Sequence, residues 1–126
     1  MESVTQPTKK LFHSFRFAFE GMYSAIKTET NWKIGLIEAF LVILAGFYFQ
    51  ISRVDWMIVI ILIGLVLSAE LGNSAVEAIV DSFTEEVHPK AKLAKDFSAG
   101  SVVIVIIASA IVGLIIFLPY LKAMFV

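Results

Sequence analysis

The sequence contains no cysteine. A disulfide framework, a thiolate metal site and a cysteine nucleophile are therefore excluded. Histidine is also scarce, and because His13 and His88 are far apart in the sequence, a structural zinc site is not expected. The Gly-x4-Gly-Lys-Ser/Thr phosphate-binding loop and the protein-kinase signatures do not occur either, and no Ser-His-Asp arrangement is supported.

Charged residues are few. They make up 17% of the 126 residues, whereas 59% are hydrophobic, a balance far from that of soluble domains. We therefore expect one integral membrane domain over residues 1–126. The formal net charge is −1 and the basic residues form no long run, so no nucleic-acid partner is expected. Residues 1–10 are polar and no apolar segment with a small-residue cleavage site follows, so no signal peptide is expected.

A first helix is predicted over residues 8–28. Its apolar residues are spaced three and four apart, which forms one stripe along a helix. The segment is too polar to span a bilayer, so we expect an amphipathic helix that lies along the membrane surface. Packing against the transmembrane helices is an equally good interpretation, and both can hold at once. The stripe consists of Leu11, Phe12, Phe15, Phe19, Met22 and Ile26.

Three apolar segments follow, each long enough to cross about 30 Å of hydrocarbon at about 1.5 Å per residue. The expected membrane spans are residues 33–51, 56–83 and 94–119. Pro89 is expected to break any helix in the charged loop 84–92, and Pro119 to close the third span. The predicted fold class is an all-α membrane protein with an N-terminal surface helix and three transmembrane helices.

Lysine and arginine predict the orientation of these spans. Basic residues are concentrated before the first span and between the second and third, and the opposite side offers only Arg53 and Lys122. The positive-inside rule then places the N-terminus in the cytoplasm and, after three spans, the C-terminus outside. Acidic residues near the cytoplasmic ends of the helices would lie where ATP and magnesium are available.

One stretch of the second span carries polar residues at helical spacing. Glu70, Asn73, Glu77 and Asp81 are spaced i, i+3, i+7 and i+11, which places them on one face of a helix. Glu70 lies where hydrocarbon is expected, and an ionisable side chain there is costly and indicates a function. A further carboxylate, Glu38, lies in the middle of the first span.

These residues alone are compatible with three kinds of function. Carboxylates at a water–membrane boundary suit magnesium shared with phosphates, a desolvated carboxylate can act as a general base, and a lysine can neutralise phosphate charge. Together they supply the parts of phosphoryl transfer to a lipid alcohol. Alternatively, Glu38 and Glu70 belong to the proton pathway of a small proton-coupled transporter subunit. A structural or partner-binding protein, with solvated helix ends, is the third interpretation.

Four segments match the motifs of one known family. They are Glu70-x-x-Asn73-Ser74-Ala75-x-Glu77-x-x-x-Asp81, Ala94-Lys95-Asp96-x-x-Ala99-Gly100, Gly21 followed by Glu29-x-Asn31, and residues 112–119. In these segments the chain resembles the prokaryotic diacylglycerol kinase family, integral membrane lipid kinases unrelated to soluble kinases. The resemblance covers nearly the whole chain from about Phe12.

The resemblance implies an ATP- and Mg²⁺-dependent kinase that acts on a lipid alcohol at the cytoplasmic face of the cell membrane. The family is a homotrimer whose sites are shared between protomers, so a homotrimeric bundle is expected. Glu29-x-Asn31, His88-Pro89 and Phe117-Leu118-Pro119 are similar to the undecaprenol kinase branch, which phosphorylates a C55 polyprenol. Diacylglycerol, converted to phosphatidic acid, is the alternative acceptor. Three residues depart from the pattern: Gly35, where that branch has histidine, Glu38 and Gly72.

Site roles are implied at the positions that match the family motifs. Glu70 would be the general base and would contact the lipid substrate together with Ala99. Glu29 and Glu77 would bind the divalent cation. The residues expected to contact the nucleotide are Lys10, Phe17, Glu29, Asn73, Glu77, Glu86, His88, Lys95 and Asp96.

Overall fold

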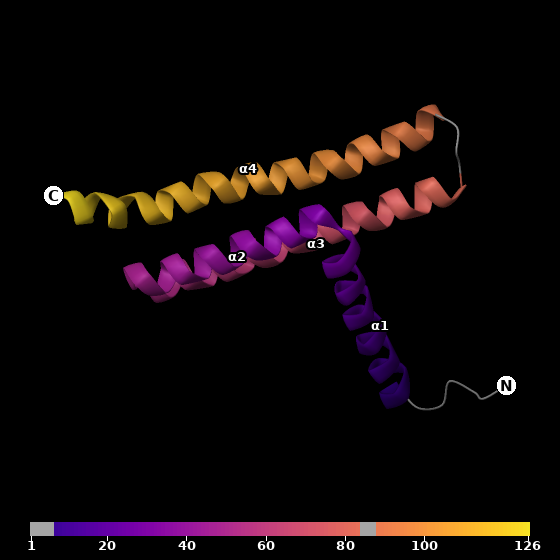
Figure 1. The fold of residues 1–126 in the computed structure, drawn as a ribbon, viewed down its shortest axis with the longest axis horizontal. Helices are drawn as coiled ribbons and strands as arrows, with labels where there is room; N and C mark the ends of the chain where they lie inside the picture. Colours follow the sequence, from indigo (N-terminus) through magenta and orange to yellow (C-terminus); the bar gives the residue numbers. More distant parts are fainter. Residues whose placement is uncertain (1–6, 84–87) are drawn as a thin grey trace.

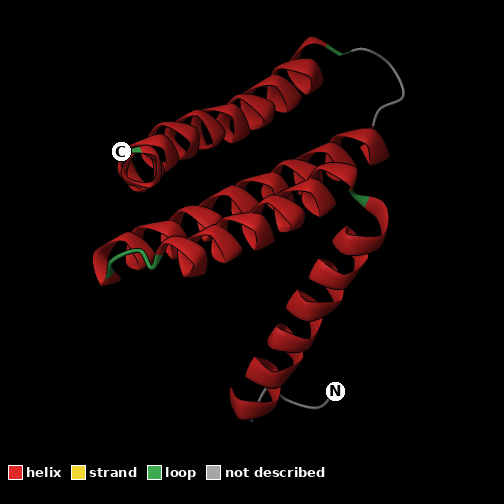
Figure 2. Ribbon diagram, turned by 60° about the vertical axis from the view of Figure 1, so that its left-hand side comes forward, coloured by secondary structure: helices red, strands yellow, loops and turns green. Residues whose placement is uncertain are grey.

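The structure, a computed structural model, describes residues 7–83 and 88–126, and over these residues it contains four α-helices and no strand (Figures 1 and 2). The helices are α1 (Pro7–Thr28), α2 (Thr30–Phe49), α3 (Arg53–Phe83) and α4 (Pro89–Phe125). The prediction of an all-α chain is confirmed. α2, α3 and α4 are each long and apolar enough to cross a membrane, in agreement with the three predicted spans.

The three long helices lie side by side, with α3 packed along both α2 and α4 (Figures 1 and 2). α1 leaves the bundle at an angle from the start of α2 (Figure 1). Its apolar stripe is exposed except for the half-buried Met22, and Ala25 is the buried residue of this helix. That α1 lies along a membrane surface, and that the chain forms a trimer, stay predictions.

The turn between α2 and α3 is tied to α4. α2 ends at Gln50 in the left-handed conformation, with φ 52°. The hydroxyl of Ser52 accepts a hydrogen bond from the Asp55 N–H at 3.1 Å, which satisfies a free donor of the first turn of α3. The Tyr120 hydroxyl donates to Asp55 Oδ2 at 2.9 Å and accepts from the Ser52 N–H at 3.3 Å. Three segments are therefore joined at this end of the bundle.

The buried apolar residues gather at the same end. Ile51, Val59 and Ile116 form the core cluster, one residue each from the turn, α3 and α4. Gly46 is buried against Trp56, and a Cβ on this glycine would lie 2.6 Å from the indole. Because no side chain fits there, the glycine permits close approach of α2 and α3. Most other large apolar side chains of the three long helices face outward, as a lipid environment requires.

α4 differs from the prediction at both ends. Pro89 does not break the helix but is its first residue, because a proline there loses no intrahelical hydrogen bond and its φ is already helical. His88 precedes it as the N-cap, and its Nδ1 accepts from the Lys90 N–H at 3.2 Å. Pro119 does not end the helix either, which continues to Phe125. The bonds of Tyr120 to Asp55 and Ser52 hold the chain in helical register after the proline.

Candidate active site

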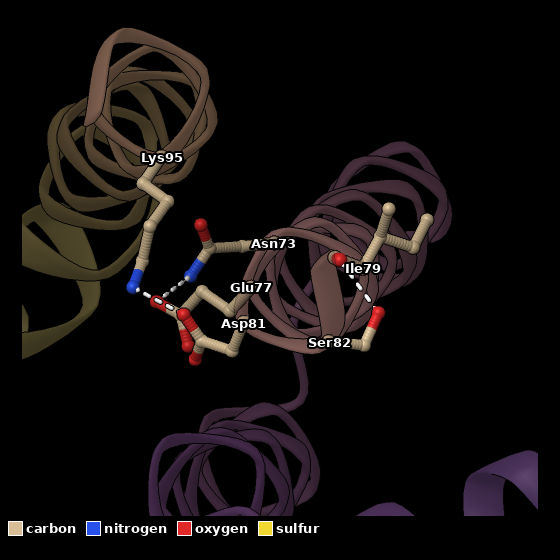
Figure 3. Close-up of polar contacts among 6 residues, drawn as sticks. All are labelled: Asn73, Glu77, Ile79, Asp81, Ser82 and Lys95. Atoms are coloured by element: carbon tan, nitrogen blue, oxygen red, sulfur yellow. Dashed lines mark hydrogen bonds and ion pairs between the residues drawn. The ribbon is translucent and has the colours of Figure 1, made fainter. Parts of the chain in front are cut away.

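The polar face predicted on α3 points toward the first turns of α4. Figure 3 shows Asn73, Glu77 and Asp81 on one side of α3, opposite Lys95. Lys95 Nζ lies 2.8 Å from Asp81 Oδ1, and Asn73 Nδ2 donates to Glu77 Oε1 at 3.3 Å. The structure therefore brings together four side chains that combine carboxylates, an amide and an ammonium group.

Glu29 joins this end of the bundle from the junction of α1 and α2. It is the N-cap residue of α2 in an extended conformation, and its side chain makes no capping hydrogen bond to that helix. Instead, the Ser74 hydroxyl donates to Glu29 Oε2 at 3.1 Å. Because Ser74 follows Asn73 directly in α3, the Glu29 carboxylate is anchored beside the polar face.

A hydrogen bond from a tryptophan fixes the position of α2 along the length of α3. Trp32 is buried, and its Nε1 donates to the Leu67 carbonyl at 3.0 Å. Leu67 is one turn away from Glu70, on the side away from Asn73. The bond therefore fixes the start of α2 at the level of Glu70, which places Glu29 next to Ser74.

Glu70 lies one helical turn before Asn73, on the side away from Glu77, and packs against Gly35 of α2. A Cβ on Gly35 would lie 3.1 Å from Glu70 Oε2 and 3.1 Å from Leu67 Cδ2. Within residues 7–83 and 88–126, Glu70 Oε2 is shielded from solvent and has no hydrogen-bond partner. A buried acceptor without a partner costs about 1–3 kcal/mol, and more when it is charged. The carboxyl group is therefore placed to accept a hydrogen bond from a bound ligand.

The described residues fit a cation that is shared with phosphates. Among them, no group of three or more His, Asp or Glu side chains could hold a metal ion. Mg²⁺ usually takes one or two protein carboxylates and completes its shell with phosphate oxygens and water. Glu29 and Glu77 supply two carboxylates at this end, and Asn73 Oδ1 is a buried oxygen without a described partner. These hard oxygen ligands suit such a cation, whereas the described part of the chain forms no metal cage of its own.

Several predicted site residues are not joined to this face by any contact the structure describes. Asp96 pairs with Lys92 on its own helix, and both side chains are more than half exposed, at 56% and 64%. His88 caps α4. Lys10 and Phe17 lie exposed on α1, and Ala99 is exposed on α4. Glu86 lies outside the described residues. The nucleotide and lipid contacts of these residues stay predictions.

Three contributors were missed by sequence reasoning. Ser74 anchors Glu29, Trp32 sets the helix register, and Gly35 makes room for Glu70. Ser74 has a signal in its spacing, because it lies four residues after Glu70 and so shares its face of the helix. The other two act across a helix pair, and no local pattern marks such contacts.

Three apolar helices with carboxylates, an amide and a lysine at one end define a multi-pass membrane protein with a polar site. The sequence model of the prokaryotic diacylglycerol kinase family matches residues 16–117. The undecaprenol kinase of Bacillus subtilis is 42% identical over 112 residues, which cover 89% of this chain and 91% of that protein. The diacylglycerol kinase of Synechocystis sp. is 34% identical, and the match covers 99% of this chain and 72% of that protein. The diacylglycerol kinase of Haemophilus influenzae is 33% identical, and the match covers 83% of this chain and 86% of that protein.

The chain belongs to the prokaryotic diacylglycerol kinase family, and its similarity to the Bacillus protein places it in the undecaprenol kinase branch. It is a lipid kinase, a phosphotransferase with an alcohol group as acceptor. Membership of a kinase family implies ATP as the phosphate donor and a divalent cation. The three apolar helices and the family together indicate a multi-pass protein of the plasma membrane.

Gly35→Ala is expected to lower kcat by about tenfold, because the new methyl group displaces the Glu70 carboxyl by a few tenths of an ångström. The protein should stay folded, since the Leu67 side chain can also give way. Steady-state kinase assays and thermal unfolding in detergent measure the two effects. Gly113→Ala is the matched control, because nothing lies within 4 Å of the Cβ it adds. Equal activity of the two variants would contradict this role for Gly35.

Proposed function

We propose that the chain is an ATP- and Mg²⁺-dependent kinase that phosphorylates the hydroxyl of undecaprenol at the cytoplasmic face of the membrane. The observation that carries the proposal is Glu70 Oε2, which is buried and has no hydrogen-bond partner among the described residues, one helical turn from Asn73 and two from Glu77. A lipid alcohol reaches this depth from the membrane, while a nucleotide reaches the shallower residues from water. The 42% identity to the Bacillus undecaprenol kinase supports the choice of acceptor.

The reaction uses few protein groups. Glu70 accepts the proton of the lipid hydroxyl as its oxygen forms a bond to the γ-phosphorus of ATP, and the bond to the ADP oxygen breaks. Lys95 neutralises negative charge on the transferring phosphoryl group. Glu29 and Glu77 would hold Mg²⁺, with Asn73 beside them. When bound, the cation supplies positive charge to the phosphate oxygens.

A homotrimer with sites shared between protomers is part of the proposal. Lys10, Phe17, Ala99 and Asp96 are exposed on one chain, so they are available to a site completed by a neighbour. α3 also carries Gly64 and Gly72 with nothing within 4 Å of their Cβ positions, and small residues of this kind allow helices of two chains to pack closely. The distribution of basic residues supports a cytoplasmic N-terminus and an outer C-terminus.

Diacylglycerol is the alternative acceptor, because relatives at 34% and 33% identity are diacylglycerol kinases. The relatives do not favour the transporter interpretation, since they are named as kinases. The residues of the site do not favour it either: a proton pathway needs Glu38 and Glu70 but has no use for the lysine that faces Glu77 and Asp81.

The deciding experiment is transfer of labelled phosphate from ATP to undecaprenol and, separately, to diacylglycerol, with the protein in detergent–lipid micelles. We expect phosphorylated undecaprenol, loss of the product on chelation with EDTA, and its return when Mg²⁺ is added. A clear preference for diacylglycerol would replace undecaprenol with the alternative acceptor. Absence of product from both lipids would overturn the proposal.

A further inference from the structure

A pocket of about 110 Å³ lies among α2, α3 and α4 on the deeper side of Glu70. It begins at Gly35, the residue that touches the Glu70 carboxyl, and extends along α2 to Val42. This distance is about 10 Å at about 1.5 Å per residue. Because its α3 wall, between Leu62 and Leu67, is entirely aliphatic, the pocket suits a short length of hydrocarbon.

Ser109 is the α4 residue that lines this pocket. Among the described residues, its Oγ is shielded from solvent and has no hydrogen-bond partner. Hydroxyl groups in helices often bond a carbonyl of the preceding turn. Among the described residues four others do so, namely those of Ser14, Thr28, Ser82 and Ser101. The Ser109 hydroxyl is therefore a buried donor whose partner is not its own helix, and an acceptor inside the pocket would satisfy it.

The second polar group of the wall cannot take over this role. Glu38 lies on α2 and lines the same pocket. The Glu38 side chain is exposed, whereas the Ser109 Oγ is shielded and lacks a partner among the described residues, so Ser109 is the group that a lipid oxygen in the pocket would satisfy. Ser109 remains the donor available to such an oxygen.

The chemistry of the two acceptor lipids differs at this position. With its hydroxyl at Glu70, a lipid places the carbons next to that hydroxyl at the mouth of the pocket. Undecaprenol presents only hydrocarbon there. Diacylglycerol carries an ester on the carbon next to the reacting one, and the ester carbonyl accepts hydrogen bonds.

We propose that Ser109 is a specificity-determining residue whose hydroxyl donates to an ester carbonyl of a glycerolipid acceptor bound with its own hydroxyl at Glu70. The inference rests on the lipid kinase function proposed above and assigns a residue to the distinction between its two candidate acceptors. Ser109 takes no part in the transfer itself, so its contribution is to binding. Undecaprenol, which has no such carbonyl, is bound without its help.

Ser109→Ala tests the inference with both acceptors, each varied as a mole fraction in mixed micelles. We expect kcat/KM for diacylglycerol to fall about three- to tenfold, the range of one hydrogen bond, through a higher KM at nearly constant kcat. The value for undecaprenol should stay within about twofold. Ser109→Thr keeps a hydroxyl and should restore part of the loss. Ser101→Ala removes a hydroxyl that bonds its own helix and should change neither acceptor.

Each contrary outcome has a separate meaning. An equal loss with both lipids, accompanied by a lower unfolding temperature, would overturn the inference and make the hydroxyl structural. A wild-type protein that phosphorylates undecaprenol but not diacylglycerol would also overturn it, and would leave the proposed function intact. A wild-type protein inactive on both lipids would overturn the proposed function, and this inference with it.

Discussion

Glu70→Gln is expected to lower kcat for transfer to the lipid hydroxyl by about 10²- to 10⁴-fold, the range contributed by a general base. The glutamine side chain has nearly the same size and still fits beside Gly35. Its amide cannot accept the hydroxyl proton, so the attacking oxygen must form its bond to phosphorus while still protonated. Glu70→Ala, which removes the polar group altogether, should abolish transfer.

Folding and cation binding should survive both changes. Glu70 Oε2 has no described hydrogen bond to lose, and the cation is assigned to Glu29 and Glu77 instead. Thermal unfolding and Mn²⁺ binding, followed by electron paramagnetic resonance, measure these two properties. Glu20→Gln is the control, because that carboxylate pairs with Arg16 on α1 in an exposed ion pair and should leave kcat unchanged. Near-normal transfer by Glu70→Gln would remove Glu70 from the role of base.

The helices could be predicted because their signals are periodic or continuous. The apolar stripe from Leu11 to Ile26 predicts α1, and three apolar runs predict α2, α3 and α4. The ends of α4 could not be predicted from proline alone. Pro89 stops a helix that approaches it but also starts one, and the cap at His88 decides between the two. Pro119 is accommodated because Tyr120 is held by Asp55, a residue far away in the sequence.

The same distinction applies to the site. Some of its features depend on a single helix and could be predicted, whereas others depend on how two helices pack. Asn73, Glu77 and Asp81 share a face because of the helical repeat, which the sequence contains in full. The opposition of that face to Lys95 depends on how α3 and α4 pack. The fit of Glu70 against Gly35 depends on the register of α2 and α3. In the sequence, Gly35 is only a departure from the family pattern. The structure shows that its missing side chain leaves space for the Glu70 carboxyl.

Lys95→Met is expected to lower kcat by about 10²- to 10³-fold, as for the loss of one group that stabilises developing charge. The effect on stability should be small, because the pair with Asp81 is exposed, at 39% for the lysine and 63% for the aspartate. Initial rates at saturating ATP and lipid measure kcat, and Lys90→Met on the same helix is the control. Asp81→Asn separates the two roles of the lysine. If this variant loses as much activity as Lys95→Met, the activity depends on the Lys95–Asp81 ion pair. The assignment of Lys95 to direct contact with phosphate would then be wrong.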